Sequence, residues 1–111
     1  MKSILGFVGG PPNHPDTERA LDLLATLRQQ GHNVQLCLVK DGVLCAIGAG
    51  GIATNHLVHR LADDGIACYY LESDLRMRGF GPEDTIPGVA PTDYERIVDL
   101  LESCDQTLGV F

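Results

Sequence analysis

Apolar residues follow two spacings in this chain, and the two spacings alternate along it. Short apolar runs rich in β-forming residues predict buried strands. These runs are residues 3–8, 34–39, 66–71 and 107–111. Between them, apolar residues recur every third or fourth position, which predicts amphipathic helices. The first such stripe is Ala20, Leu23, Leu24 and Leu27. Alternating strands and helices of this length predict an α/β fold whose mostly parallel sheet is covered on both faces.

Capping residues and glycines indicate where the predicted helices begin and end. Asp16 is the expected N-cap of the first helix, and Gly31 follows its last turn. The other full helices are expected to begin at Thr54 or Asn55, at Ser73 or Asp74, and at Thr92 or Asp93. The proline-containing segments 11–15 and 81–91 should be loops, with a short strand near 86–89. We therefore expect one three-layer α/β/α domain over residues 1–111, with about five strands.

The charge and the length of the apolar runs limit the partners and the location. The chain has 15 acidic and 8 basic residues among 111, a net charge of -7, so a nucleic-acid partner is not expected. No apolar run approaches the roughly 20 residues that span a membrane, so no membrane partner is expected either. The first residues lead into a strand without a signal-peptide pattern, so we expect a cytoplasmic protein.

The four cysteines show no spacing of a metal-binding or dithiol motif. They are Cys37, Cys45, Cys68 and Cys104, without a C-x-x-C pair. In a reducing cytoplasm they should be free thiols. Cys37 and Cys68 lie within predicted strands and are expected in the core. Cys104 follows a helix C-terminus, where the dipole disfavours a thiolate, and is expected to be unreactive.

Cys45 is the candidate for chemistry. Asp41-Gly42 ends the second predicted strand, and Asp41 could cap a short helix over 43–47. Cys45 would then lie within the first turn or so of a helix, at the carboxyl edge of the sheet, where a helix N-terminus stabilises a thiolate. His14, in the proline loop after the first strand, is expected to face this region as a proton donor or thiolate partner. The alternative is that Cys45 is a small buried apolar residue.

Two other patterns have weaker support in their context. The spacing G-x-G-x-x-A over 48–53, with Glu72 beyond it, resembles a dinucleotide fingerprint, but it does not directly follow the first strand of its unit. His56 and His59 are three residues apart on one predicted helix face, yet no third ligand accompanies them, so surface histidines are expected. No cofactor or metal is therefore expected. Asp74, Arg76 and Arg78 should form a solvated surface.

Residues 68–111 resemble the carboxyl half of the DsrE/DsrF/DsrH (Tus) sulfur-relay family, most closely its DsrH/TusB branch. The matching motifs are D-L-x-x-R-G at 74–79, I-P-G at 86–88 and D-Y at 93–94. Upstream, Asp41-Gly42-Val43 matches a D-G-V that ends the family's second strand, and the loop before the first helix is similar to that of DsrE-type members. The resemblance is specific in the last 44 residues and looser before them.

The resemblance implies small α/β subunits that assemble into oligomers and pass persulfide sulfur between proteins. The positions that match the family's transfer cysteines are Leu71 and about Ala20, and neither is a thiol. Two functions therefore remain open. Cys45 could carry sulfane sulfur as a persulfide, with Asp41, Gly42 and His14 around it, or the chain could be a non-catalytic structural or ligand-binding subunit. In both, the expected partners are copies of this chain or related subunits, together with a sulfur donor or acceptor protein.

Overall fold

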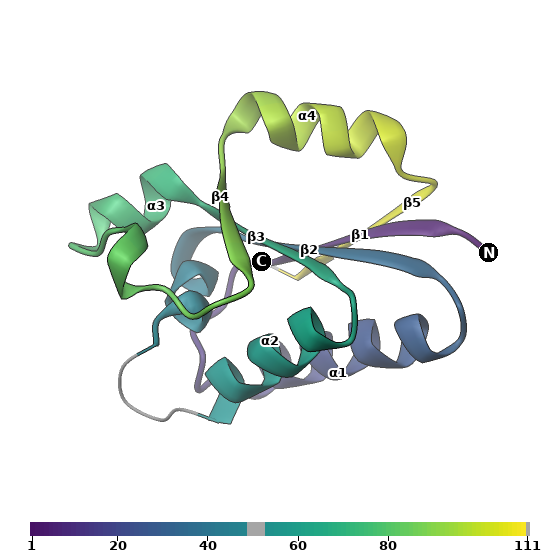
Figure 1. Cartoon of the computed structure of the whole chain (residues 1–111), viewed down its shortest axis with the longest axis horizontal. Helices are drawn as coiled ribbons and strands as arrows, with labels where there is room; N and C mark the ends of the chain where they lie inside the picture. The colour runs from purple at the N-terminus through teal and green to yellow at the C-terminus, as the bar shows by residue number, and fades with distance from the viewer. Residues whose placement is uncertain (49–52, 111) are drawn as a thin grey trace.

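Five parallel strands form one sheet in the order β4-β3-β2-β1-β5. The computed structural model describes residues 1–48 and 53–110 (Figure 1). The strands are β1 Ser3–Val8, β2 Asn33–Leu38, β3 Ala67–Leu71, β4 Val89–Thr92 and β5 Gln106–Val110. The helices are α1 Pro15–Gln29, α2 Ala53–Asp63, α3 Glu72–Met77 and α4 Tyr94–Ser103, with 3-10 turns η1 Lys40–Ala46 and η2 Pro82–Asp84.

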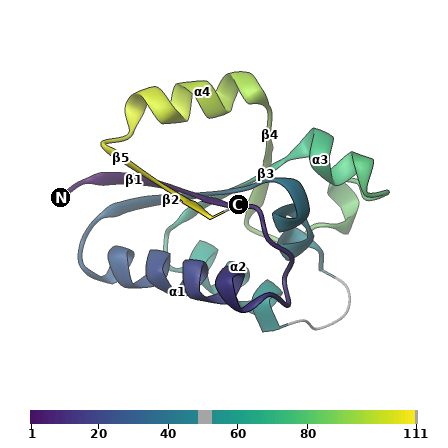
Figure 2. The same cartoon turned by 180° about the vertical axis from the view of Figure 1, so that it is seen from behind.

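Helices cover both faces of the sheet, as the sequence predicts. Figures 1 and 2 show α1 and α2 on one face and α4 alone on the other. Alternate residues of each strand point to opposite faces. In β2, Leu36 and Leu38 belong to the larger apolar cluster beside α1 and α2, whereas Cys37 belongs to a smaller cluster with Leu5 and Ile97 of α4. The three-layer α/β/α architecture with a parallel sheet is thus confirmed.

Several local predictions differ from the structure. α2 begins at Ala53 rather than at Thr54 or Asn55, and α3 begins at Glu72 rather than at Ser73 or Asp74. α1 begins at Pro15 because His14, not Asp16, is its N-cap, and the Asp16 backbone N–H donates to His14 Nδ1 at 3.1 Å. β4 spans 89–92 rather than 86–89, and it tolerates Pro91 because it is an edge strand. The segment after β2 is a 3-10 turn that begins at Lys40, so Asp41 does not cap it. The alternative cap Asp93 on α4 is confirmed, because its Oδ1 accepts from the Arg96 N–H at 2.9 Å.

Candidate functional site

The carboxyl ends of all five strands lie at one edge of the sheet because every strand pair is parallel. The loop before α1, the turn η1 and the first turns of α3 and α4 follow β1, β2, β3 and β4 at this edge. Figure 1 shows α3 beyond the edge. Ligand sites of α/β sheets lie at this edge, so the predicted site residues and any binding pocket are sought here.

Two segments that carry the family resemblance meet at this edge. Arg78 Nε donates to Asp41 Oδ1 at 3.0 Å, and Arg78 Nη2 lies 2.9 Å from the same oxygen. Arg78 Nη1 also donates to the Asp74 carbonyl at 2.9 Å. Asp74 Oδ2 accepts from the Lys40 N–H at 2.7 Å. Asp74 and Arg78, expected mainly as solvated surface, thus also join two segments of the chain. We call the Arg78–Asp41 and Asp74–Lys40 contacts the η1–α3 clamp.

Gly42 lets η1 lie directly against the end of β1. A Cβ at this position would be 2.0 Å from the Val8 carbonyl oxygen, a distance at which the backbone itself must move. Lys40, at the start of the turn, has a φ of 51°, which is uncommon for a residue with a side chain. The predicted role of Asp41-Gly42 in shaping the turn is thus consistent with the contacts of both residues, although Asp41 acts through Arg78 rather than as a cap.

Cys45 lies inside the core. Its side chain is 0% exposed and belongs to the larger apolar cluster. Burial raises the pKa of the Cys45 thiol from its ordinary 9.0 to about 12. The expectation of an accessible thiolate at a helix N-terminus is therefore wrong. The cause is that η1 packs its apolar side against the sheet instead of presenting it at the edge.

None of the other cysteines replaces Cys45 as an exposed thiol at the carboxyl edge. Burial raises the pKa of Cys68 to about 12, and burial together with the charge of Asp74 does the same for Cys37. Both are core residues, as predicted. Cys104 is half-buried at the C-terminal end of α4, beside the amino end of β1, where Asp105 bonds to Ser3. Cys104 therefore lies at the amino edge of the sheet, opposite the carboxyl edge.

His14 has a structural contact rather than a catalytic one. Its Nδ1 caps α1, and its side chain is 53% exposed, with Asp16 Oδ2 at 3.8 Å. Cys45 is fully buried whereas the His14 side chain is largely exposed, so the structure offers the imidazole no accessible thiolate, and its role as a partner of Cys45 stays a prediction. Of the four predicted residues, Asp41, Gly42 and Cys45 all lie in η1, but the Cys45 side chain is buried in the core and His14 lies in a different loop.

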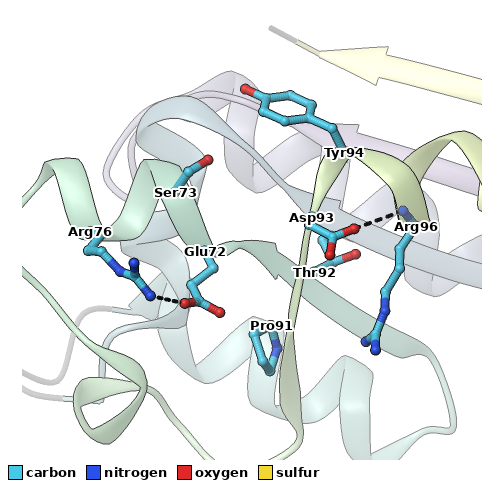
Figure 3. A pocket seen from close by; sticks show the side chains of 8 residues that line it. All are labelled: Glu72, Ser73, Arg76, Pro91, Thr92, Asp93, Tyr94 and Arg96. Atoms are coloured by element: carbon cyan, nitrogen blue, oxygen red, sulfur yellow. Dashed lines mark hydrogen bonds and ion pairs between the residues drawn. The ribbon is translucent and has the colours of Figure 1, made fainter.

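A polar pocket of about 510 Å³ opens between the first turns of α3 and α4, and the sequence did not predict it (Figure 3). Its lining residues are Glu72, Ser73, Arg76, Pro91, Thr92, Asp93, Tyr94 and Arg96. Arg76 forms an ion pair with Glu72. The signal available in the sequence was weak: two helix starts, each following a predicted strand, carry a charged residue three or four positions later. That pattern is common on any surface.

The two positions at which the family resemblance would place a transfer cysteine hold buried apolar side chains. Leu71 is 2% exposed and Ala20 is 8% exposed. Leu71 directly precedes Glu72, which lines the pocket. Neither position of this chain offers a thiol to the pocket.

The structure tests the histidine pair and the glycine-rich pattern only in part. His56 is exposed and His59 forms an i,i+4 pair with Asp63 at 3.2 Å. Among residues 1–48 and 53–110, no group of three or more His, Cys, Asp and Glu side chains could hold a metal ion. Most of the glycine-rich dinucleotide pattern, residues 49–52, lies outside the described residues. No helix in the described part of the chain is long and apolar enough to cross a membrane.

The parallel five-stranded sheet between two layers of helices, with the D-G turn bonded to the D-L-x-x-R-G segment, defines a small α/β domain. The chain belongs to the family described as DsrH like protein, whose sequence profile matches residues 15–107. Its fold is similar to that of the ychN protein from E. coli, with a TM-score of 0.90 at 20% identity, covering 99% of this chain and 100% of that one.

A second similar structure is the protein of unknown function MTH1491 from Methanobacterium thermoautotrophicum. Its TM-score is 0.75 at 16% identity, again covering 99% of this chain and 100% of that chain. Comparison with curated proteins gives no match. At these identities the structural neighbours establish the fold, and the family match establishes the relationship.

Proposed function

We propose that the chain is a subunit of a sulfur-trafficking assembly that takes part by binding, without carrying persulfide on a thiol of its own. Membership of the DsrH-like family supports the sulfur-relay context. The observation that carries the proposal is the complete burial of Cys45. The polar pocket beside α3 and α4 provides a place where a ligand or a segment of a partner could bind without covalent chemistry.

The persulfide hypothesis for Cys45 meets two physical obstacles. The reactive form of cysteine is the thiolate, and with a pKa of about 12 only about one molecule in 10⁵ is ionised at pH 7. The sulfur is also 0% exposed, so a donor persulfide has no access to it. For Cys45 to accept sulfur, η1 would have to leave the sheet, which breaks the η1–α3 clamp.

Mass spectrometry of the intact protein tests this proposal. The folded chain is incubated with inorganic polysulfide, desalted and weighed, beside the same chain in urea, where every thiol is accessible. We expect no adduct of about 32 Da on the folded chain and adducts on the unfolded one. Cys104→Ser controls for reaction at the half-buried thiol. An adduct that forms on folded Cys104→Ser and disappears in the additional Cys45→Ser variant overturns the proposal and restores the persulfide carrier.

We also propose that the subunit assembles with copies of itself or with related subunits. Tyr94, Val98 and Leu101 follow one another at i, i+4 and i+7 on α4 and are 66%, 51% and 41% exposed. A stripe of this kind on a soluble helix favours an interface. Light scattering at micromolar concentration should give a mass above the 11.9 kDa of one chain. A strict monomer, both alone and with related subunits, contradicts this proposal.

A further inference from the structure

Two hollows meet at Thr92 and Arg96, at the junction of β4 and α4. One is the pocket of about 510 Å³ described above, and the other, of about 210 Å³, lies toward Tyr69, Asp99 and Leu100. Thr92 and Arg96 line both. They are therefore the two side chains that a ligand in either hollow would touch.

The hydroxyl of Thr92 is buried without a hydrogen-bond partner. The residue is 4% exposed, and its Oγ1 has no partner within the described chain. Buried hydroxyls in folded proteins nearly always have a partner in the protein, in water or in a ligand. Thr92 lines both hollows, so a ligand in either lies against the residue that carries this unpaired hydroxyl.

The charged groups of the pocket leave donors uncommitted. Glu72 is neutralised by Arg76, and Asp93 accepts from the backbone of α4 at Arg96 N. The Arg96 guanidinium has no ion pair with any residue in the described part of the chain. Figure 3 shows Thr92, Asp93 and Arg96 together at the start of α4. The positive end of that ten-residue helix adds to the field of Arg96.

We infer that Thr92 and Arg96 form the centre of a binding site for a small oxyanion, either a carboxylate or an inorganic anion. An oxyanion accepts hydrogen bonds, and the larger hollow offers three donors without a partner in the described chain: the Arg96 guanidinium, the Thr92 hydroxyl and, across the hollow, the Ser73 hydroxyl. The Asp99 carboxylate lines only the smaller hollow, so the anion is expected in the larger one. The two carboxylates of the pocket already have partners, which reduces their repulsion of the ligand. This site requires no thiol; it rests on the proposed binding role of the same pocket, and its test is separate from the polysulfide experiment.

Titration of the ¹⁵N-labelled full chain with sodium phosphate or with sodium acetate, at constant ionic strength, tests the site. Saturable shifts of the amides of residues 92–96 are expected with at least one anion, and the pair of probes separates an inorganic oxyanion from a carboxylate. Arg96→Gln should weaken binding about tenfold, and Thr92→Val, which keeps the shape and removes the hydroxyl, about threefold. Arg60→Gln, an exposed arginine on α2, is the matched control and should bind as the wild type does.

Three results would overturn the inference. The first is the absence of saturable shifts at residues 92–96 with either anion. The second is equal affinity of the wild type and Arg96→Gln, which shows general screening by salt. The third is a marked fall of melting temperature in Thr92→Val, because that shows that the hydroxyl has a partner inside the protein. A Thr92→Val chain that fails to fold counts as this third result, and the Arg96→Gln arm is a separate test of the site.

Discussion

Replacing Arg78 by glutamine should loosen η1 from α3. The guanidinium holds three acceptor contacts: Nε and Nη2 with Asp41 Oδ1, at 3.0 and 2.9 Å, and Nη1 with the Asp74 carbonyl at 2.9 Å. Glutamine has a shorter side chain and no charge, so it cannot span both acceptors. The two segments it disconnects are 37 positions apart in the sequence, so the effect is on tertiary structure.

The size of the effect follows from exposure. The side chains of Arg78 and Asp41 are 27% and 57% exposed, so water screens the ion pair, and exposed pairs contribute about 0.2–1 kcal/mol. The bond to the Asp74 carbonyl is partly buried and adds about 0.5–1.5 kcal/mol. We expect Arg78→Gln to lower the free energy of unfolding by about 1–2 kcal/mol.

Urea unfolding of the wild type, Arg78→Gln, Asp41→Asn and the double variant measures the pair directly. The coupling energy between Asp41 and Arg78 should be about 1 kcal/mol and should fall when salt is raised to about 0.5 M. The matched control is the Asp16–Arg19 pair, 3.2 Å apart with side chains 58% and 77% exposed, for which less than about 0.5 kcal/mol is expected. A coupling energy at Asp41–Arg78 no larger than that of the control refutes the reasoning.

Two further changes probe the same edge. Gly42→Ala should destabilise the chain by about 3 kcal/mol or more, because the new Cβ would lie 2.0 Å from the Val8 carbonyl oxygen. Thermal unfolding followed by circular dichroism measures this change, and a near-wild-type melting temperature would contradict the close packing of Gly42 against β1. Alkaline pH should also destabilise the chain, because the folded state keeps protons on Cys37, Cys45 and Cys68 that the unfolded state releases above about pH 9. The free energy of unfolding is unaffected below about pH 9 and falls toward pH 12 by about 1.4 kcal/mol per pH unit for each of these thiols. Cys45→Ala should reduce the slope of stability against pH by the contribution of one thiol. An unchanged slope would show that Cys45 ionises freely in the folded state.

The fold could be predicted because its signals are local and repeated. The stripe of α1 and the apolar run of β2 each identify their element, and their alternation determines the parallel sheet. The caps were harder, since His14 and Asp16 are both able to accept from a backbone N–H and only the loop geometry decides between them. The predicted bounds of β4 ended too early because a proline such as Pro91 argues against a strand unless the strand is known to lie at the edge of the sheet.

The site was harder to predict because reactivity depends on burial, and burial is a tertiary property. The position of Cys45 after Asp41-Gly42 is compatible with an exposed helix start and equally with a turn that faces the core. The contact that decides between them joins Asp41 to Arg78, far away in the sequence. The pocket depends in the same way on α3 and α4, which meet only after β4 has added to the sheet.

The motifs that identify the family in this chain hold its fold rather than its chemistry. D-G at 41–42 and D-L-x-x-R-G at 74–79 supply Asp41, Asp74 and Arg78, which are the residues of the η1–α3 clamp. These contacts involve no thiol, so they shape the carboxyl edge without requiring a cysteine there. Here Leu71 is sealed while Glu72, the next residue, lines an open polar pocket. The proposed function therefore places binding between α3 and α4, and the anion titration and the polysulfide experiment examine that pocket and the thiols separately.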